Sequence, residues 1–109
     1  MATSQEYVVF VLEQLRGAGF LRYRKMFGEY MVYVNEKPLI LVCDNTAFVK
    51  KLNAVTAVMA GAATGYPYAG AKEHYILDID DAEKSREIVA LLDRATPPPP
   101  PKKPRAKKA

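Results

Sequence analysis

Tryptophan is absent from this sequence, and cysteine and histidine occur once each, as Cys43 and His74. A single cysteine cannot form an intrachain disulfide, and one Cys with one His cannot complete a Cys/His zinc site within one chain. No apolar run approaches the roughly 20 residues that span a bilayer. The N-terminus lacks the basic segment and cleavage site of a signal peptide, so we expect neither secretion nor membrane insertion.

The residues that are present suit one modest globular domain. The chain has 109 residues, 50% hydrophobic and 26% charged, which is enough apolar material for a single core. The excess of positive charge is confined to the C-terminus, where residues 97–109 carry five cations and no acid: Lys102, Lys103, Arg105, Lys107 and Lys108. Residues 1–96 hold 11 basic and 12 acidic groups, and this near-neutrality argues against a nucleic-acid groove on the domain itself.

The domain boundary is expected after residue 96. Five consecutive prolines begin at Pro97 and cannot continue a helix, because proline lacks a backbone N–H. They favour a stiff polyproline II spacer, and the basic segment beyond them has no apolar residue except alanine. We therefore predict a folded domain over 1–96 and a disordered, proline-rich basic tail over 97–109.

The N-terminal segment predicts a helix over 4–16. Thr3 and Glu6 have the spacing of a capping box, with Thr3 as the N-cap. Apolar residues then recur at helical spacing, at Val8, Val11, Leu12 and Leu15. Val9 and Phe10 lie off this stripe, which predicts that the helix is covered on more than one side.

The rest of the domain predicts strands followed by mixed elements. Four β-prone runs with short polar connections are expected at 20–27, 30–34, 39–43 and 46–50, and they imply an antiparallel meander. Helices are expected at 52–60 and 81–95, the second capped by Asp80 and Asp81, with a strand at 74–79 between them. The order α-β(3-4)-α-β(1-2)-α predicts an α+β fold: a two-layer sandwich with helices on one face of a mainly antiparallel sheet.

Two segments of the meander are candidates for binding. Arg22, Arg24 and Lys25 form a basic run that either contacts an anion such as nucleic acid or simply protects an exposed edge strand, and the second interpretation is favoured. The segment Met26, Phe27, Gly28, Glu29 and Tyr30 follows it. Gly28 there indicates a bend or tight turn, Met26 and Phe27 are expected in the core, and Glu29 has no carboxylate beside it for acid–base chemistry.

The remaining reactive side chains favour structural roles. Cys43 closes an apolar strand and His74 stands alone, so a nucleophilic pair of the two has no local support. Asp78, Asp80 and Asp81 lack the glycine and distal glutamate of a calcium loop, and helix capping explains the last two. Tyr66, Tyr68 and Tyr75 cluster around a Gly/Pro loop, as a partner surface or as packing of that loop onto the sheet.

The helix followed by Met26-Phe27-Gly28-Glu29-Tyr30 resembles the N-terminal domain of the TfoX/Sxy family. The segments from Lys37 to Asp44, from Phe48 to Lys50 and from Tyr75 to Leu77 fit the same pattern, so the resemblance covers nearly all of 1–95. It implies a fold like that of secretion chaperones. It also implies a bacterial regulator of natural competence that acts at promoters, although this chain has a proline–lysine tail where such regulators carry a C-terminal helical domain. The family supplies no established catalytic residues.

These observations predict a non-enzymatic, cytoplasmic bacterial interaction module without metal or cofactor. We expect a protein partner or a homodimer, an accessory role in transcription, weak attraction of nucleic acid to the tail, and no membrane. Two alternatives stay open. One is a chaperone-like or adaptor dimer with no nucleic-acid role, and the other is an enzyme whose pocket the motifs do not reveal.

Overall fold

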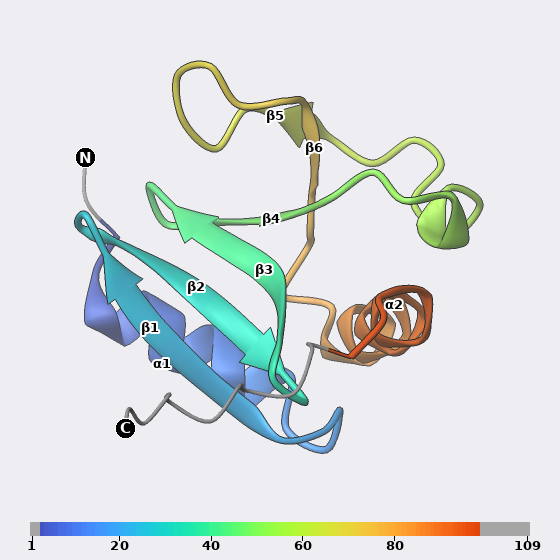
Figure 1. Cartoon of the computed structure of the whole chain (residues 1–109), viewed down its shortest axis with the longest axis horizontal. Helices are drawn as coiled ribbons and strands as arrows, with labels where there is room; N and C mark the ends of the chain where they lie inside the picture. The colour runs from blue at the N-terminus through green and yellow to red at the C-terminus, as the bar shows by residue number, and fades with distance from the viewer. Residues whose placement is uncertain (1–2, 99–109) are drawn as a thin grey trace, which may run out of the picture.

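The computed structural model describes residues 3–98, which form two α-helices and a six-stranded antiparallel sheet. The expected α+β class is confirmed. The sheet has the order β1-β2-β3-β4-β6-β5 (Figure 1). Its strands are β1 (Leu21–Met26), β2 (Glu29–Val34), β3 (Lys37–Cys43), β4 (Thr46–Val49), β5 (Thr64–Gly65) and β6 (His74–Ile76).

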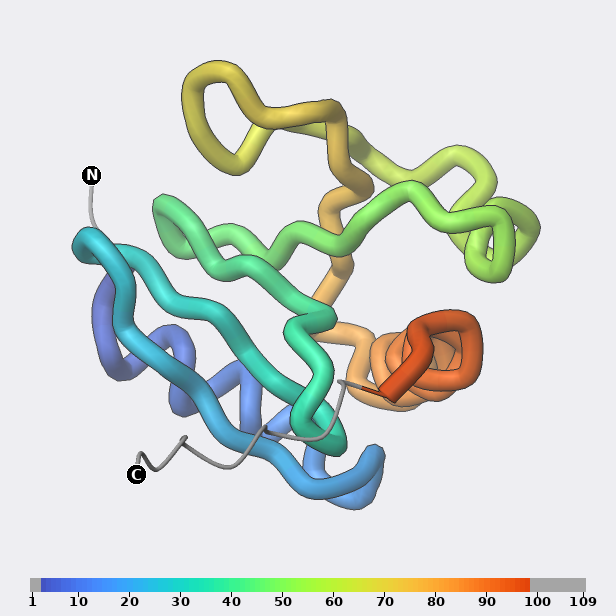
Figure 2. Tube along the Cα trace, in the orientation of Figure 1, coloured from blue at the N-terminus to red at the C-terminus, as the bar shows by residue number. Residues whose placement is uncertain are grey.

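Three two-residue turns connect the first four strands. Phe27-Gly28, Asn35-Glu36 and Asp44-Asn45 all have positive φ at both positions, the pattern of the type I′ turns that suit the twist of a hairpin. Beyond β4 the chain leaves the sheet and passes through residues 50–63 before it returns as β5 and β6 (Figure 2). The meander expected from the polar connections is therefore confirmed over β1–β4.

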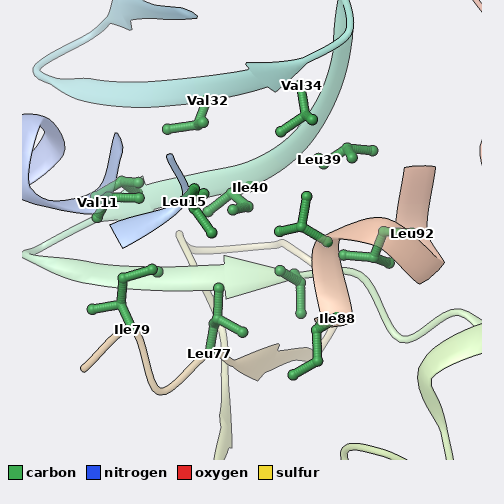
Figure 3. Close-up of a cluster of buried hydrophobic side chains, with 14 of the residues drawn as sticks. Val11, Leu15, Val32, Val34, Leu39, Ile40, Leu77, Ile79, Ile88 and Leu92 are labelled. Atoms are coloured by element: carbon green, nitrogen blue, oxygen red, sulfur yellow. The ribbon is translucent and has the colours of Figure 1, made fainter. Parts of the chain in front are cut away.

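Both α-helices cover one face of the sheet. Helix α1 (Gln5–Gln14) contributes Val8 and Val11, and helix α2 (Ala82–Ala95) contributes Ile88, Val89 and Leu92. These side chains meet the alternate residues of the central strands, so that Val32, Val34 and Ile40 are completely buried (Figure 3). Helix α2 buries the face that the sequence predicts, including Ser85. The Ser85 hydroxyl donates to Asp78 O at 3.0 Å.

The prediction of a helix over residues 52–60 is wrong. Residues 52–60 contain only a 3₁₀ turn, η1 (Asn53–Val55), followed by further turns. Only Val55 and Met59 of this segment are buried, and β-branched residues at 55, 56 and 58 disfavour a continuous helix. The last strand is also shorter than expected, and β5, which pairs with it, has too few residues to leave a periodic signal.

The N-cap of α1 is Ser4 rather than Thr3. The Ser4 hydroxyl accepts from Tyr7 N at 3.1 Å, whereas the buried Thr3 side chain is used in contacts with distant strands. Thr3 Oγ1 donates to Glu29 Oε1 at 2.5 Å and accepts from Asn45 N at 3.1 Å. The expected cover over the outer side of α1 is also wrong, because Val9 and Phe10 are exposed within the described part of the chain.

Candidate binding groove on the open face of the sheet

The face of the sheet opposite the helices carries a continuous row of side chains. Paired residues of neighbouring strands lie on the same side of a sheet. The register therefore joins one residue from each of five strands: Arg24, Met31, Leu41, Phe48 and Ile76. Four of the five are apolar. Strand β2 is therefore apolar on both faces, because Tyr30, Val32 and Val34 on its other face are buried in the core.

A groove of about 640 Å³ is hollowed into this face. Its floor consists of Met31, Leu41 and Phe48 from the row, together with Leu39 and Leu52. One wall is the connection between β5 and β6, from Tyr68 to His74. The volume is in the range of sites that hold a small molecule or the side chains of a bound peptide.

The rim of the groove is positively charged. Lys50, Lys51 and Lys72 line it, with Glu73 as the acidic residue among them. Lys51 Nζ lies 2.6 Å from Glu73 Oε1, and this bond raises the pKa of Lys51 and lowers that of Glu73. Lys50 and Lys72 are exposed and make no ion pair within residues 3–98, so two cations are available to an anionic ligand.

The loop that forms the wall is anchored at several points. Pro67 is buried between two exposed tyrosines, and the Lys51–Glu73 pair ties the end of the loop to the segment after β4. His74 donates from Nδ1 to Lys72 O over 2.7 Å, and its ring packs edge-on against Phe48 with centroids 6.5 Å apart. The groove is therefore shaped before any ligand arrives.

The side chains with possible chemistry lie apart from one another in the described structure. Within residues 3–98, no three His, Cys, Asp or Glu side chains come together as a metal site. Cys43 is buried, and this burial, with the Glu29 and Asp44 carboxylates nearby, raises its pKa to about 11. Cys43 pairs with Thr46 at the start of β4, whereas His74 precedes Tyr75, the partner of Val49, and so lies opposite Lys50 just beyond the end of β4. These positions are four residues apart along β4, roughly 13 Å, so the two side chains do not form a pair.

Of the three basic residues on β1, Arg22 forms an ion pair, whereas Arg24 and Lys25 form none with any described residue. Arg22 binds Glu36 Oε1 through Nε at 3.0 Å and Nη2 at 2.8 Å, and its guanidinium lies 4.1 Å from the centroid of the Tyr33 ring. Arg24 and Lys25 are exposed and make no ion pair in the described chain. Arg24 ends the row that crosses the open face, whereas Lys25 pairs with Tyr30 and lies on the helix side.

The motif from Met26 to Tyr30 is a hairpin turn with its flanks. Gly28 has φ +82° at the second turn position, as the expectation of a tight turn requires. Phe27 is not in the core: its side chain is fully exposed at the turn, because its φ of +50° directs it away from the sheet. Met26 is half-buried, and Tyr30 is buried against Tyr23 with ring centroids 5.4 Å apart.

Glu29 is a structural acceptor rather than half of a carboxylate pair. Its Oε1 accepts from Thr3 N at 3.2 Å, from Thr3 Oγ1 and from Asp44 N at 3.1 Å. The carboxylate thus joins the start of the chain to the β1–β2 and β3–β4 turns. Sequence reasoning could not find this role, because the three segments come together only in the folded sheet.

The three tyrosines expected at a partner surface are separated. Tyr68 is exposed and lines the groove, and Tyr66 is exposed beside it in the chain. Tyr75 is packed against the core, with Lys51 Nζ 5.3 Å from its ring centroid. The groove residues that the sequence interpretation missed are Met31, Leu41, Lys50 and Lys72. Met31 was the available signal for the groove, because an apolar residue on the second face of a strand indicates that this face also contacts something.

The basic residues of the tail, Lys102, Lys103, Arg105, Lys107 and Lys108, lie outside the described residues. Helix α2 ends at Ala95 and Thr96 is its C-cap. The domain boundary after residue 96 stays a prediction. Among the described residues, no helix is long and apolar enough to cross a membrane.

No family model matches the chain. A search among curated proteins finds "Uncharacterized 12.7 kDa protein in trpE 5′region" of Spirochaeta aurantia, 33% identical over 109 residues, which are 98% of this chain and 95% of that protein. The chain belongs to the family of that protein. The match runs through the helices, the sheet and the groove described above, and it carries no statement of activity. Membership of the TfoX/Sxy family and a role in transcription stay predictions.

Proposed function

We propose that this protein is a non-catalytic binding module whose open-face groove takes an acidic, amphipathic segment of a partner protein. The observation that carries the proposal is an apolar floor combined with two rim lysines, Lys50 and Lys72, that make no ion pair with any described residue. Aliphatic side chains of a partner would bury against Met31 and Leu41, and its carboxylates would meet the lysines. The transcriptional role implied by the TfoX resemblance would then be exerted through that partner.

Single-stranded nucleic acid is the competing ligand for a basic sheet face. Such ligands stack their bases on exposed aromatic rings. Here the floor is mainly aliphatic, Phe48 is nearly buried, and the Tyr33 ring is covered by Arg22. Tyr68 is the one exposed tyrosine among the described groove residues, whereas stacking of successive bases needs several rings. The groove therefore favours a peptide.

The test is a titration of the full chain with a synthetic peptide of alternating Leu and Glu, followed by methyl NMR of Met31 and Leu41. We expect both methyl signals to shift. We expect Lys50→Glu and Lys72→Glu each to weaken binding by at least about fivefold, because each reversal replaces an attractive charge contact with a repulsive one. Lys84→Glu is the matched control, because Lys84 is exposed but does not line this groove. Equal binding of a Leu/Lys peptide, or preference for a single-stranded oligonucleotide, would contradict the proposal.

A further inference from the structure

Phe27 is the most exposed large apolar side chain in the described part of the chain. It is fully exposed, and it occupies the first position of a two-residue turn at φ +50°. The equivalent positions of the other two turns hold Asn35 and Asp44, which tolerate left-handed backbone far better than a bulky aromatic residue does. Phe27 therefore brings neither burial nor turn preference to the monomer.

The turn presents this ring on a rigid support. Gly28 O accepts from Thr3 N at 3.3 Å, and the next residue, Glu29, is held by its bonds to Thr3 and Asp44. Two cations that make no ion pair within residues 3–98, Arg24 on the open face and Lys25 on the helix side, precede the ring along β1. An aromatic anchor flanked by positive charge fits an apolar pocket with an acidic rim.

The same chain carries such a pocket. A second cavity, of about 590 Å³, lies on the helix side of the sheet, with apolar walls that include Val58, Met59 and Ile88. Asp78, Asp80 and Asp81 line it, with Lys84 as its one lining cation among the described residues. All four charged side chains are exposed. Tyr7 lines the same cavity, and burial together with the neighbouring Asp80 carboxylate raises the pKa of its hydroxyl.

We propose that the chain forms a two-fold dimer in which the Phe27 turn of each copy inserts into the Asp-rimmed cavity of the other. Charge complementarity selects this cavity over the open-face groove, because the groove is rimmed by lysines that would repel Arg24 and Lys25.

The position of the cavity allows the exchange to be reciprocal. Asn45 and Thr46 line its edge, and the adjacent Asp44 N donates to Glu29 beside the Phe27 turn. The β1–β2 and β3–β4 turns lie at the same end of the sheet (Figure 1). A two-fold axis near this end lets one surface serve as both anchor and acceptor, as an isologous interface requires.

Sedimentation equilibrium of the full chain up to about 1 mM tests the proposal. We expect a concentration-dependent rise from monomer to dimer mass. Phe27→Asn should raise the dimer dissociation constant at least about tenfold, since each copy loses one buried aromatic ring. This variant should fold, because asparagine suits the turn, and circular dichroism checks that it does. Phe20→Asn is the matched control, because Phe20 is exposed at the opposite end of β1.

Charge-reversal variants test which cavity receives the Phe27 side chain. Lys25→Glu and Asp80→Lys should each weaken the dimer, and the double variant should regain affinity relative to both single variants. A monomer at all concentrations, or a dimer that Phe27→Asn leaves unchanged, would overturn the proposal. A double variant no tighter than the single ones would overturn the choice of cavity.

Discussion

At the scale of single residues, the motif around Gly28 combines a conformational requirement with a hydrogen-bonding one. Gly28 has φ +82°, and L-residues reach this region only with strain. Glu29 next to it accepts from backbone and side chain of the buried Thr3. The motif therefore stabilises one end of the sheet.

Gly28→Ala should lower the free energy of unfolding by about 1–2 kcal/mol, because alanine is strained at this φ. Gly28→Val should lower it further, since β-branching restricts the left-handed region more severely. Urea denaturation of the three proteins measures both differences. A valine variant with unchanged stability would mean that the turn relaxes without cost.

Cys43 should be almost inert in the folded protein. Burial raises the pKa of its thiol from 9.0 to about 11, so the reactive thiolate at pH 8 is about a hundredfold scarcer than for a free thiol. The folded state favours the protonated thiol, so this contribution to stability is full below the unfolded pKa and is lost as pH rises from about 9 to 11. Labelling with a thiol reagent should be slow at pH 8 and accelerate in urea, and rapid labelling without urea would contradict the burial.

At the scale of elements, polar contacts fasten α2 to the β2–β3 turn. Lys37 Nζ lies 3.0 Å from Asp93 Oδ1 and donates to Asp93 O at 2.8 Å. Asn35 Nδ2 donates to Asp93 Oδ2 at 3.2 Å, while Asn35 Oδ1 accepts from Phe20 N. This contact holds the last turns of α2 against the sheet, where Leu92 is buried.

Lys37→Met should destabilise the protein by about 1–2 kcal/mol, because it leaves the half-buried Asp93 carboxylate without its cation. A double-mutant cycle with Asp93→Asn, measured by urea denaturation, gives the pairwise energy. Arg22→Met is the control for an exposed pair and should cost about 1 kcal/mol or less. Equal losses at both sites would show that burial does not strengthen the Lys37–Asp93 contact.

At the scale of the whole molecule, the proline–lysine tail is predicted to lie outside the folded domain. Deletion of 97–109 should change the free energy of unfolding by less than about 1 kcal/mol, because α2 and its C-cap are complete at Thr96. Thermal denaturation of full-length protein and residues 1–96 tests this. A larger loss would show that the tail docks on the domain.

The number of cations in the tail sets an upper limit on the salt dependence of any binding of duplex DNA by the tail. Its five cations can neutralise about five phosphates, which gives a log–log salt slope no steeper than about −4.5 and little dependence on base sequence. Titrations of full-length protein and residues 1–96 at several salt concentrations measure the slope. Equal affinity of both proteins would transfer the binding surface to the domain, with Arg24 and Lys25 as the first candidates.

The sequence by itself was sufficient for the α+β class, the four-stranded meander, the capped C-terminal helix and the tight turn at Gly28. These features follow from local physics: β-propensity, helical spacing, Asn and Asp in turns, and the permissive backbone of glycine. Only the tertiary structure decided that Thr3 bonds to Glu29, that residues 52–60 form turns, and that Phe27 is exposed. It also decided that Met31, Leu41 and Phe48 form one groove floor with lysines around it. The Thr3–Glu29 bond and the groove floor depend on cross-strand register, which joins residues that are distant in the chain and leaves no periodic signal along it.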